Sequence, residues 1–184
     1  MSRRAWILTI IVLVAAAAIL LAMGRNPVCT CGAIDLWVGE RDSARTSQML
    51  SDWYSFSHIV HGLLFYAALR FALRRWPAGD RFLAALLIEA GWEVLENTPM
   101  VIDRYRATTA ALGYTGDSVL NSLSDILMMA LGFLAARKLP IWASIMLLLA
   151  LELVPLLVIR DNLFLNVWTL LAPNAAVQAW QAAG

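Results

Sequence analysis

The stretch AWILTIIVLVAAAAILLAM, residues 5–23, contains no charged residue and follows two arginines. About 20 mostly apolar residues cross a bilayer, because its hydrocarbon is about 30 Å thick and each helical residue rises about 1.5 Å. Residues 22–24, Ala-Met-Gly, could serve as a signal-peptidase site. However, the apolar core of a signal peptide usually has about 7–15 residues. We therefore expect residues 5–23 to form an uncleaved membrane anchor.

Four further stretches are long and apolar enough to span a membrane: residues 53–73, 81–101, 118–137 and 141–159. Of the 184 residues, 61% are hydrophobic and 15% are charged, and the mean hydropathy is +0.70. Soluble domains have about 45–50% apolar and about 25% charged residues. The apolar segment 163–171 is too short to span, which favours a re-entrant or interfacial helix. The sequence predicts a single all-α domain over residues 1–184, a polytopic transmembrane helical bundle with about five spanning helices.

The basic residues predict the orientation of this bundle. With the N-terminus inside, eight basic residues lie on the cytoplasmic side and six on the other side, a modest bias of the kind that sets membrane topology. The eight are Arg3, Arg4, Arg70, Arg74, Arg75, Arg81, Arg137 and Lys138, and the six are Arg25, Arg41, Arg45, Arg104, Arg106 and Arg160. We expect a multi-pass protein of the cell inner membrane with a cytoplasmic N-terminus.

Polar residues recur at helical spacing inside three of the predicted spans. The only two histidines, His58 and His61, open the second span, and the polar residues of the next two spans are Glu89, Glu93, Glu96, Asp117, Asn121 and Asp125. An ionised carboxylate in hydrocarbon costs about 2.5 kcal/mol or more, so such groups are kept where they face one another, a metal or water. At about 100° per residue, each set falls within about 60–80° of its helix. Each of the three helices thus presents one narrow polar stripe.

The predicted topology brings these stripes to the same leaflet. We expect a pocket that opens to the periplasm, in which a histidine reaches Glu93 or Glu96 and either Asp117 or Asn121 completes the ring. Glu89, Asp125 and Glu152 should lie about two turns deeper. A loop over residues 102–116 should cover the mouth, and its Arg104, Arg106 and Tyr114 are candidates for substrate binding.

Three kinds of chemistry suit this set of side chains. Imidazole and carboxylate together can bind a divalent metal such as Zn, Mn or Fe, with candidate ligands His58, His61, Glu89, Glu93 and Asp125. Metal-free acid–base catalysis would use His58, His61, Glu93, Glu96, Asp117 and Asn121, with an arginine binding an anionic group. The third kind of chemistry is the passage of protons or ions along the carboxylates.

A structural interpretation remains beside these. Polar side chains in membrane helices often only join helices, each contributing about 0.6–2 kcal/mol through a hydrogen bond. This applies above all to Asn97, Ser122, Ser124 and Glu152. Cys29 and Cys31 lie in the predicted outer loop, where a disulfide, a thiol pair and a bond to a partner are all open.

Three segments resemble a known family. SHIVHG at 57–62, EAGWEVLEN at 89–97 and GYTGDSVLNS at 113–122 are similar to an uncharacterised bacterial inner-membrane family, the domain of unknown function 2585. That resemblance covers nearly the whole chain and implies a multi-pass membrane protein without an established activity.

A looser similarity is to VanZ-like membrane proteins, which are linked to glycopeptide resistance. Their pattern has a basic residue three before a histidine, an acid on the next helix, and Asp-x-x-x-Asn before a glycine-rich stretch. It is similar to His58 and His61, Glu89 or Glu93, and Asp117 and Asn121 with Gly132. The chain departs from that pattern at His58, where a lysine is usual, and at Ser57, where an aspartate is usual.

The depth of the pocket favours an enzyme that hydrolyses, or transfers a group on, a lipid or lipid-linked head group. Membrane lipids are then the expected partners. A transporter or ion-linked protein would need polar groups that continue inward, but residues 63–69 and 126–136 include no acid, histidine, lysine or arginine. A structural or assembly protein is the other alternative. The net charge of +1 makes nucleic acid an improbable partner.

Overall fold

The computed structural model describes residues 3–110 and 113–183, and all regular structure in those ranges is helical. The helices are α1 (Arg3–Ala22), α2 (Ser55–Ala72), α3 (Ala78–Glu96), α4 (Pro99–Thr108), α5 (Val119–Lys138), α6 (Ile141–Ile159), α7 (Leu163–Leu171) and α8 (Ala175–Ala182). A helix occupies each of the five stretches that the sequence predicts as spans, so the all-α class is confirmed.

Three of these helices, α1, α5 and α6, are long and apolar enough to cross a membrane. Helices α2 and α3 are of similar length, with 18 and 19 residues, but they carry the histidines and the three glutamates of the polar stripes. Those side chains lower the apolarity of the two helices. The structure therefore supports three membrane spans by length and composition, and spanning by α2 and α3 stays a prediction.

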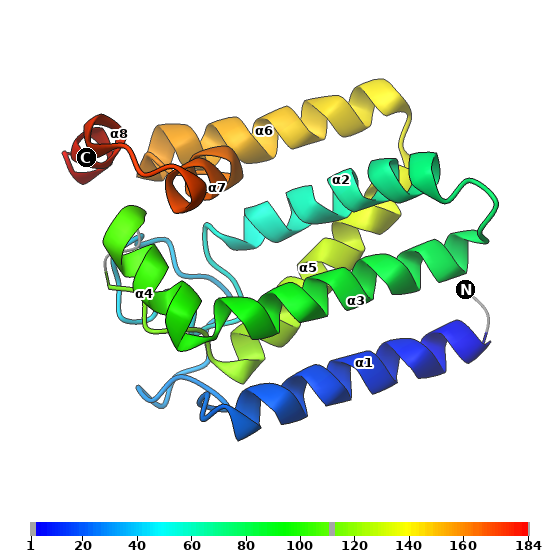
Figure 1. The fold of residues 1–184 in the computed structure, drawn as a ribbon, viewed down its shortest axis with the longest axis horizontal. Helices are drawn as coiled ribbons and strands as arrows, with labels where there is room; N and C mark the ends of the chain where they lie inside the picture. Colours follow the sequence, from blue (N-terminus) through cyan, green and yellow to red (C-terminus); the bar gives the residue numbers. More distant parts are fainter. Residues whose placement is uncertain (1–2, 111–112, 184) are drawn as a thin grey trace.

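The five long helices lie side by side and alternate in direction (Figure 1). Helices α4, α7 and α8 gather at one end together with residues 24–54, and we call this the head end (Figure 1). The opposite end holds the start of α1, the α2–α3 connection and the α5–α6 connection, and we call it the turn end. This alternation is the arrangement expected of a bundle whose helices cross a membrane in turn.

Helices α2 and α5 touch through their backbones at two glycines. A Cβ atom on Gly62 would lie 2.0 Å from the carbonyl oxygen of Met129, and one on Gly132 would lie 2.0 Å from the carbonyl oxygen of Ile59. Small residues allow such close approach between membrane helices. The contact fixes the segment that carries both histidines against the helix that carries Asp125.

Apolar side chains fill the half of the bundle nearer the turn end. Phe82, Leu86, Ile126, Met129 and Phe133 are all buried in one cluster from α3 and α5. This packed layer separates the polar groups of the head end from the arginines at the turn end.

Two predicted boundaries are wrong. The span at 81–101 ends at Glu96, and the region predicted as a loop over 102–116 begins inside the helix α4, which continues to Thr108; residues 111 and 112 lie outside the described ranges. The cause is Pro99, which cannot continue the hydrogen bonding of α3 but fits the first turn of a new helix. The connection therefore folds back over the head end as a short helix.

The head end is held together by polar contacts. Cys29 and Cys31 form a disulfide. The buried Asp161, which follows α6, accepts hydrogen bonds from the Asn162 backbone and from the side chains of Tyr54, Asn166 and Gln181. These contacts fix α7 and α8, of which the sequence predicts only α7. Whether α7 is re-entrant or interfacial stays a prediction.

Candidate functional site

A cavity of about 230 Å³ lies at the head end between α2, α3, α5 and α7. Its polar lining residues are Ser47, Tyr54, Ser57, His58, His61, Glu89, Glu96, Tyr105, Asn166, Tyr114, Asp117 and Asp125. Its apolar lining residues are Phe65, Ile88, Trp92, Leu163 and Val167. Within the described ranges no lysine or arginine lines the cavity, so its charge is set by carboxylates and imidazoles.

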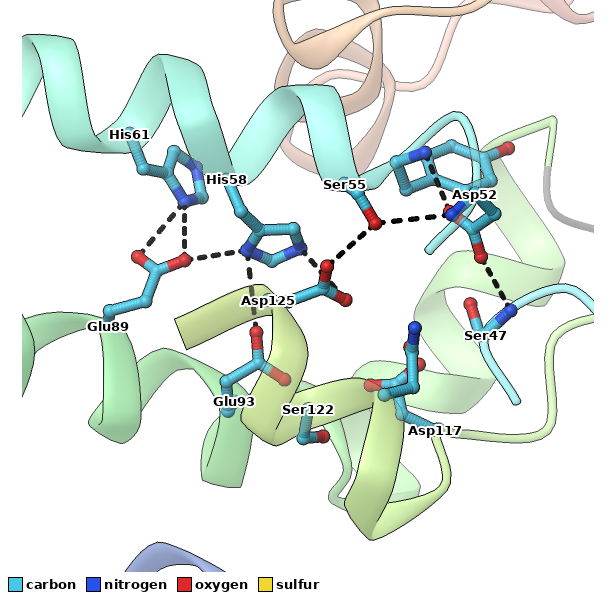
Figure 2. A network of polar contacts seen from close by, with 12 residues as sticks. Ser47, Asp52, Ser55, His58, His61, Glu89, Glu93, Asp117, Ser122 and Asp125 are labelled. Atoms are coloured by element: carbon cyan, nitrogen blue, oxygen red, sulfur yellow. Dashed lines mark hydrogen bonds and ion pairs between the residues drawn. The ribbon is translucent and has the colours of Figure 1, made fainter. Parts of the chain in front are cut away.

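His58 stands at the centre of the polar cluster, with a carboxylate near each ring nitrogen (Figure 2). Its Nδ1 lies 2.6 Å from Glu89 Oε1 and 3.4 Å from Glu93 Oε1, and its Nε2 lies 3.7 Å from Asp125 Oδ2. The ring is buried, with an exposed fraction of 7% for the residue. The expected approach of a histidine to Glu93 is therefore present in the structure.

His61 lies one turn along α2 and shares a carboxylate with His58. Its Nδ1 is 3.1 Å from both oxygens of Glu89, whose side chain is fully buried. Its ring stacks on Phe65 with centroids 5.6 Å apart. Glu89 thus bridges the two imidazoles, although the sequence placed it deeper than they are.

The cluster continues from Asp125 into the segment before α2 (Figure 2). The Ser55 hydroxyl donates to Asp125 Oδ1 at 2.9 Å, and its oxygen accepts from the Asp52 backbone at 3.2 Å. Asp52 Oδ2 then accepts from the Ser47 backbone at 2.7 Å. Burial raises the pKa of Asp52. These contacts fix the orientation of Asp125 toward His58.

Asp117 forms the other edge of the cavity. Its Oδ2 accepts from Asn97 Nδ2 at 2.7 Å and from the Tyr114 hydroxyl at 2.9 Å, and its backbone N–H donates to Asn97 Oδ1. Burial raises the pKa of Asp117 to about 6, although these hydrogen bonds oppose the rise. The carboxyl group can therefore gain or lose a proton near neutral pH. Tyr105 lies beside Glu96, and burial raises the pKa of its hydroxyl well above its ordinary value.

Three groups in the cluster have donor atoms close enough to share a metal ion. They are His58 with His61 and Glu89, His58 with Glu93 and Asp125, and Glu93 with Glu96 and Asp117, with the donor atoms of each group within 4.8 Å of one another. Glu93 is only 1% exposed, and its Oε1 is buried without a hydrogen-bond partner. Its one polar contact is the ion pair with His58 Nδ1 at 3.4 Å, and a buried carboxylate this weakly paired is costly unless a proton or a cation offsets its charge.

The structure brings together seven of the residues predicted from the sequence: His58, His61, Glu89, Glu93, Glu96, Asp117 and Asp125. Tyr114 also lines the cavity and donates to Asp117. Asn121 instead donates to the carbonyl of Met49, which fixes residues 24–54 to α5.

Two predicted substrate-binding arginines lie elsewhere. Arg104 is exposed and donates to the carbonyl of Leu170 in α7, and Arg106 is exposed. Neither lines the cavity. A substrate role for them stays a prediction without support from their position.

Several residues of the site were not predicted, among them Ser55 and Tyr105. Ser55 lies three residues before His58, so helical spacing alone could have placed it on the same face. Tyr105 lies on α4, which was predicted as a loop, and no pattern pointed to it. Asn97, interpreted from the sequence as a helix-joining residue, holds Asp117 in position.

Comparison with known proteins identifies similar chains. The family described as "Protein of unknown function (DUF2585)" matches residues 20–183. A UPF0314 protein of Paracoccus denitrificans is 51% identical over 175 residues, which are 95% of this chain and 91% of the relative. One from Sphingopyxis alaskensis is 49% identical over 183 residues, which are 100% of this chain and 97% of the relative. No solved structure matches the chain. The similarity to VanZ-like proteins is not tested by these matches.

Proposed function

This chain belongs to the DUF2585 family, and from its site we propose that it is a membrane-embedded enzyme that acts on a lipid or lipid-linked head group. The reaction would be hydrolysis or group transfer, assisted by a divalent metal held in the head-end cavity. The observation that carries the proposal is the convergence of His58, Glu93 and Asp125, in which the buried Oε1 of Glu93 forms no hydrogen bond and only a 3.4 Å ion pair with His58.

The balance of charge supports a bound cation. Five carboxylates and two imidazoles converge, and no lysine or arginine from the described residues lines the cavity to offset the acids. Several buried carboxylates at such distances repel one another when ionised. Either cations must offset their charge or some of them must be protonated. His58, Glu93 and Asp125 offer one nitrogen and two oxygen donors, a set that suits Zn, Mn or Fe. His61 and Glu89 would complete or orient that set.

The surroundings of the cavity support an amphiphilic substrate. An apolar groove of about 630 Å³ runs between α2, α6 and α7, lined by residues such as Val60, Leu148 and Trp168. Leu163 and Val167 of α7 line both this groove and the polar cavity. A molecule with a polar head in the cavity and an apolar chain in the groove would lie across α7.

The chain has its own groups for proton transfer. In hydrolysis of an ester or a phosphoester, the attacking water loses a proton and the leaving oxygen gains one. With a pKa near 6, Asp117 is suited to take and return that proton. The Tyr114 hydroxyl, which donates to Asp117, could pass a proton between the carboxyl group and the cavity. A metal would supply polarisation of the substrate oxygen. Glu89 holds both imidazoles in fixed orientations.

The transporter alternative finds less support. The buried layer of Phe82, Leu86, Ile126, Met129 and Phe133 lies between the cavity and the turn end. None of these side chains can carry a proton or an ion. A polar pocket backed by this apolar layer suits an enzyme better than a path through the membrane.

Metal analysis of the full-length protein in detergent is the first test. We expect about one divalent ion per chain in the wild type, and at least a tenfold loss of affinity in Glu93→Gln, because the amide keeps the size but removes the negative charge. Asp42→Asn is the matched control, since Asp42 lies at the surface outside the cavity and pairs with Arg41. Equal metal content in all three proteins would remove the metal from the proposal.

Lipid extracts of a deletion strain test the reaction. A lipid or lipid-linked species should accumulate in the deletion strain and in a strain that carries Glu93→Gln, and it should disappear with the wild type or Asp42→Asn. If Glu93→Gln and His61→Asn together restore the wild-type lipid profile, the cluster is structural and the enzyme proposal is wrong.

A further inference from the structure

A third hollow lies at the turn end and adjoins the apolar groove described above, because Leu64 and Leu148 line both. It is a groove of about 960 Å³ between α2, α5 and α6, with Arg81 of α3 at its edge. Its walls are mostly apolar and include Leu63, Leu64, Ile145 and Leu148. Ile141 and Leu148 both line it, so it extends along about two turns of α6, roughly 10 Å.

Four arginines surround the mouth of this groove: Arg70, Arg74, Arg81 and Arg137. Arg74 donates to the carbonyl of Phe71, and its guanidinium stacks on the Phe71 ring at 4.7 Å. Within residues 3–110 and 113–183 none of the four forms an ion pair. The mouth therefore concentrates positive charge that nothing in the described chain neutralises.

Arg81 differs from ordinary surface arginines. Its exposed fraction is 9%, and its Nε is buried without a hydrogen-bond partner. A buried guanidinium without an acceptor is costly, and a phosphate oxygen is the acceptor that its planar geometry fits best. The groove thus combines a buried donor that has no hydrogen-bond partner with mostly apolar walls.

We propose that this groove binds an anionic glycerophospholipid, with the phosphate between Arg81 and Arg137 and an acyl chain along α2 and α6. The charge excess selects a negative head group, and the apolar walls select a molecule that carries a hydrocarbon chain. Basic pockets between membrane helices on the cytoplasmic side bind anionic lipids in this way. No residue lines both this groove and the head-end cavity, so the proposal does not depend on the proposed enzymatic function.

Native mass spectrometry of the full-length protein in an uncharged maltoside detergent tests the proposal. Dioleoyl phosphatidylglycerol should stay bound to the wild type, and dioleoyl phosphatidylcholine should bind more weakly. Each of Arg81→Gln and Arg137→Gln should weaken phosphatidylglycerol binding about fivefold, the effect of about one basic residue near a membrane surface. Arg137 is exposed, so its variant keeps the test valid if Arg81→Gln does not fold.

Arg75→Gln is the matched control, because Arg75 is an exposed neighbour of Arg74 that does not line the groove. It should bind phosphatidylglycerol as the wild type does. If Arg75→Gln weakens binding as much as Arg137→Gln, or if phosphatidylcholine binds equally well, the groove does not select an anionic lipid and the proposal is wrong. Displacement of the lipid by millimolar inorganic phosphate would also overturn the proposal, because it would assign the arginines to free phosphate.

Discussion

Helices α5 and α6 are nearly equal in length and are both apolar enough to span a membrane, yet they differ in what surrounds them. In the most apolar stretch of each helix, 56% of the residues of α5 are buried and only 6% of those of α6. Helix α5 is central and contacts α1, α2, α3 and α6 (Figure 1). Helix α6 buries only Pro155 and Ile159.

The difference explains why an acid inside each helix has a different role. Asp125 of α5 is buried and lies against His58 and Ser55. Glu152 of α6 is partly exposed, and its Oε2 accepts from the backbone N–H of Phe164 at the start of α7. An acid in an apolar helix therefore marks a site only when the helix is enclosed by others, and α6 serves instead to position α7 over the cavity.

The largest effect should come from the α2–α5 contact. Gly132→Ala places a methyl group against the Ile59 backbone, which cannot move aside as a flexible side chain would. We expect a loss of about 3 kcal/mol of stability, at the upper end of the range for overpacking. Thermal unfolding in detergent measures it.

Gly91→Ala is the matched control, because nothing lies within 4 Å of a Cβ at that position in α3. It should be neutral or should stabilise by up to about 1 kcal/mol, since alanine favours a helix over glycine. If Gly132→Ala and Gly91→Ala had equal effects on stability, the close contact between α2 and α5 at Gly62 and Gly132 would be wrong.

The next effect concerns the end of α6, where burial raises the pKa of Asp161 to about 6. Its unfolded value is about 3.8, so the folded chain holds the proton more tightly than the unfolded chain. The stability that Asp161 contributes is full below about pH 4 and is lost as the pH rises to about 6, by at most about 3 kcal/mol.

The measurement compares unfolding of the wild type and Asp161→Asn between pH 4 and pH 7. The difference in stability between the two proteins should shift in favour of the variant as the pH rises through this window, because asparagine does not ionise. A constant difference across the window would show that Asp161 titrates normally and is not enclosed by α7 and α8.

The substitution Asp125→Asn should change the stability of the fold less than the two changes above, but it tests the site directly. It keeps an oxygen that accepts from Ser55 and removes the negative charge of a candidate metal ligand near His58. We expect a 10–100-fold loss in metal affinity, by analogy with other changes around metal ligands, with little change in the unfolding temperature of metal-free protein. Zinc and manganese titrations of both proteins check this, and unchanged affinity would remove Asp125 from the ligand set.

The fold was more predictable from the sequence than the site. Apolar length predicted the five long helices because hydrophobicity along a chain is a local property. The partner of each histidine was not predictable, because it depends on how far α2 and α3 are offset along their axes. The stripe of Glu89, Glu93 and Glu96 was found by spacing, but only packing shows that Glu89 contacts both histidines. Pro99 was the available signal for α4.

The smallest effect is expected for Glu152→Gln, which most directly tests the contrast between the two helices. The amide oxygen of glutamine can still accept from the Phe164 backbone, and the partial exposure of Glu152 lets the side chain readjust. Stability should therefore change by less than about 1 kcal/mol, and metal content and the lipid profile of cells should stay as in the wild type. Metal analysis and thermal unfolding, run beside Asp125→Asn, provide the comparison. If Glu152→Gln lost metal as Asp125→Asn does, the site would extend to α6, and the view of α6 as a support for α7 alone would be wrong.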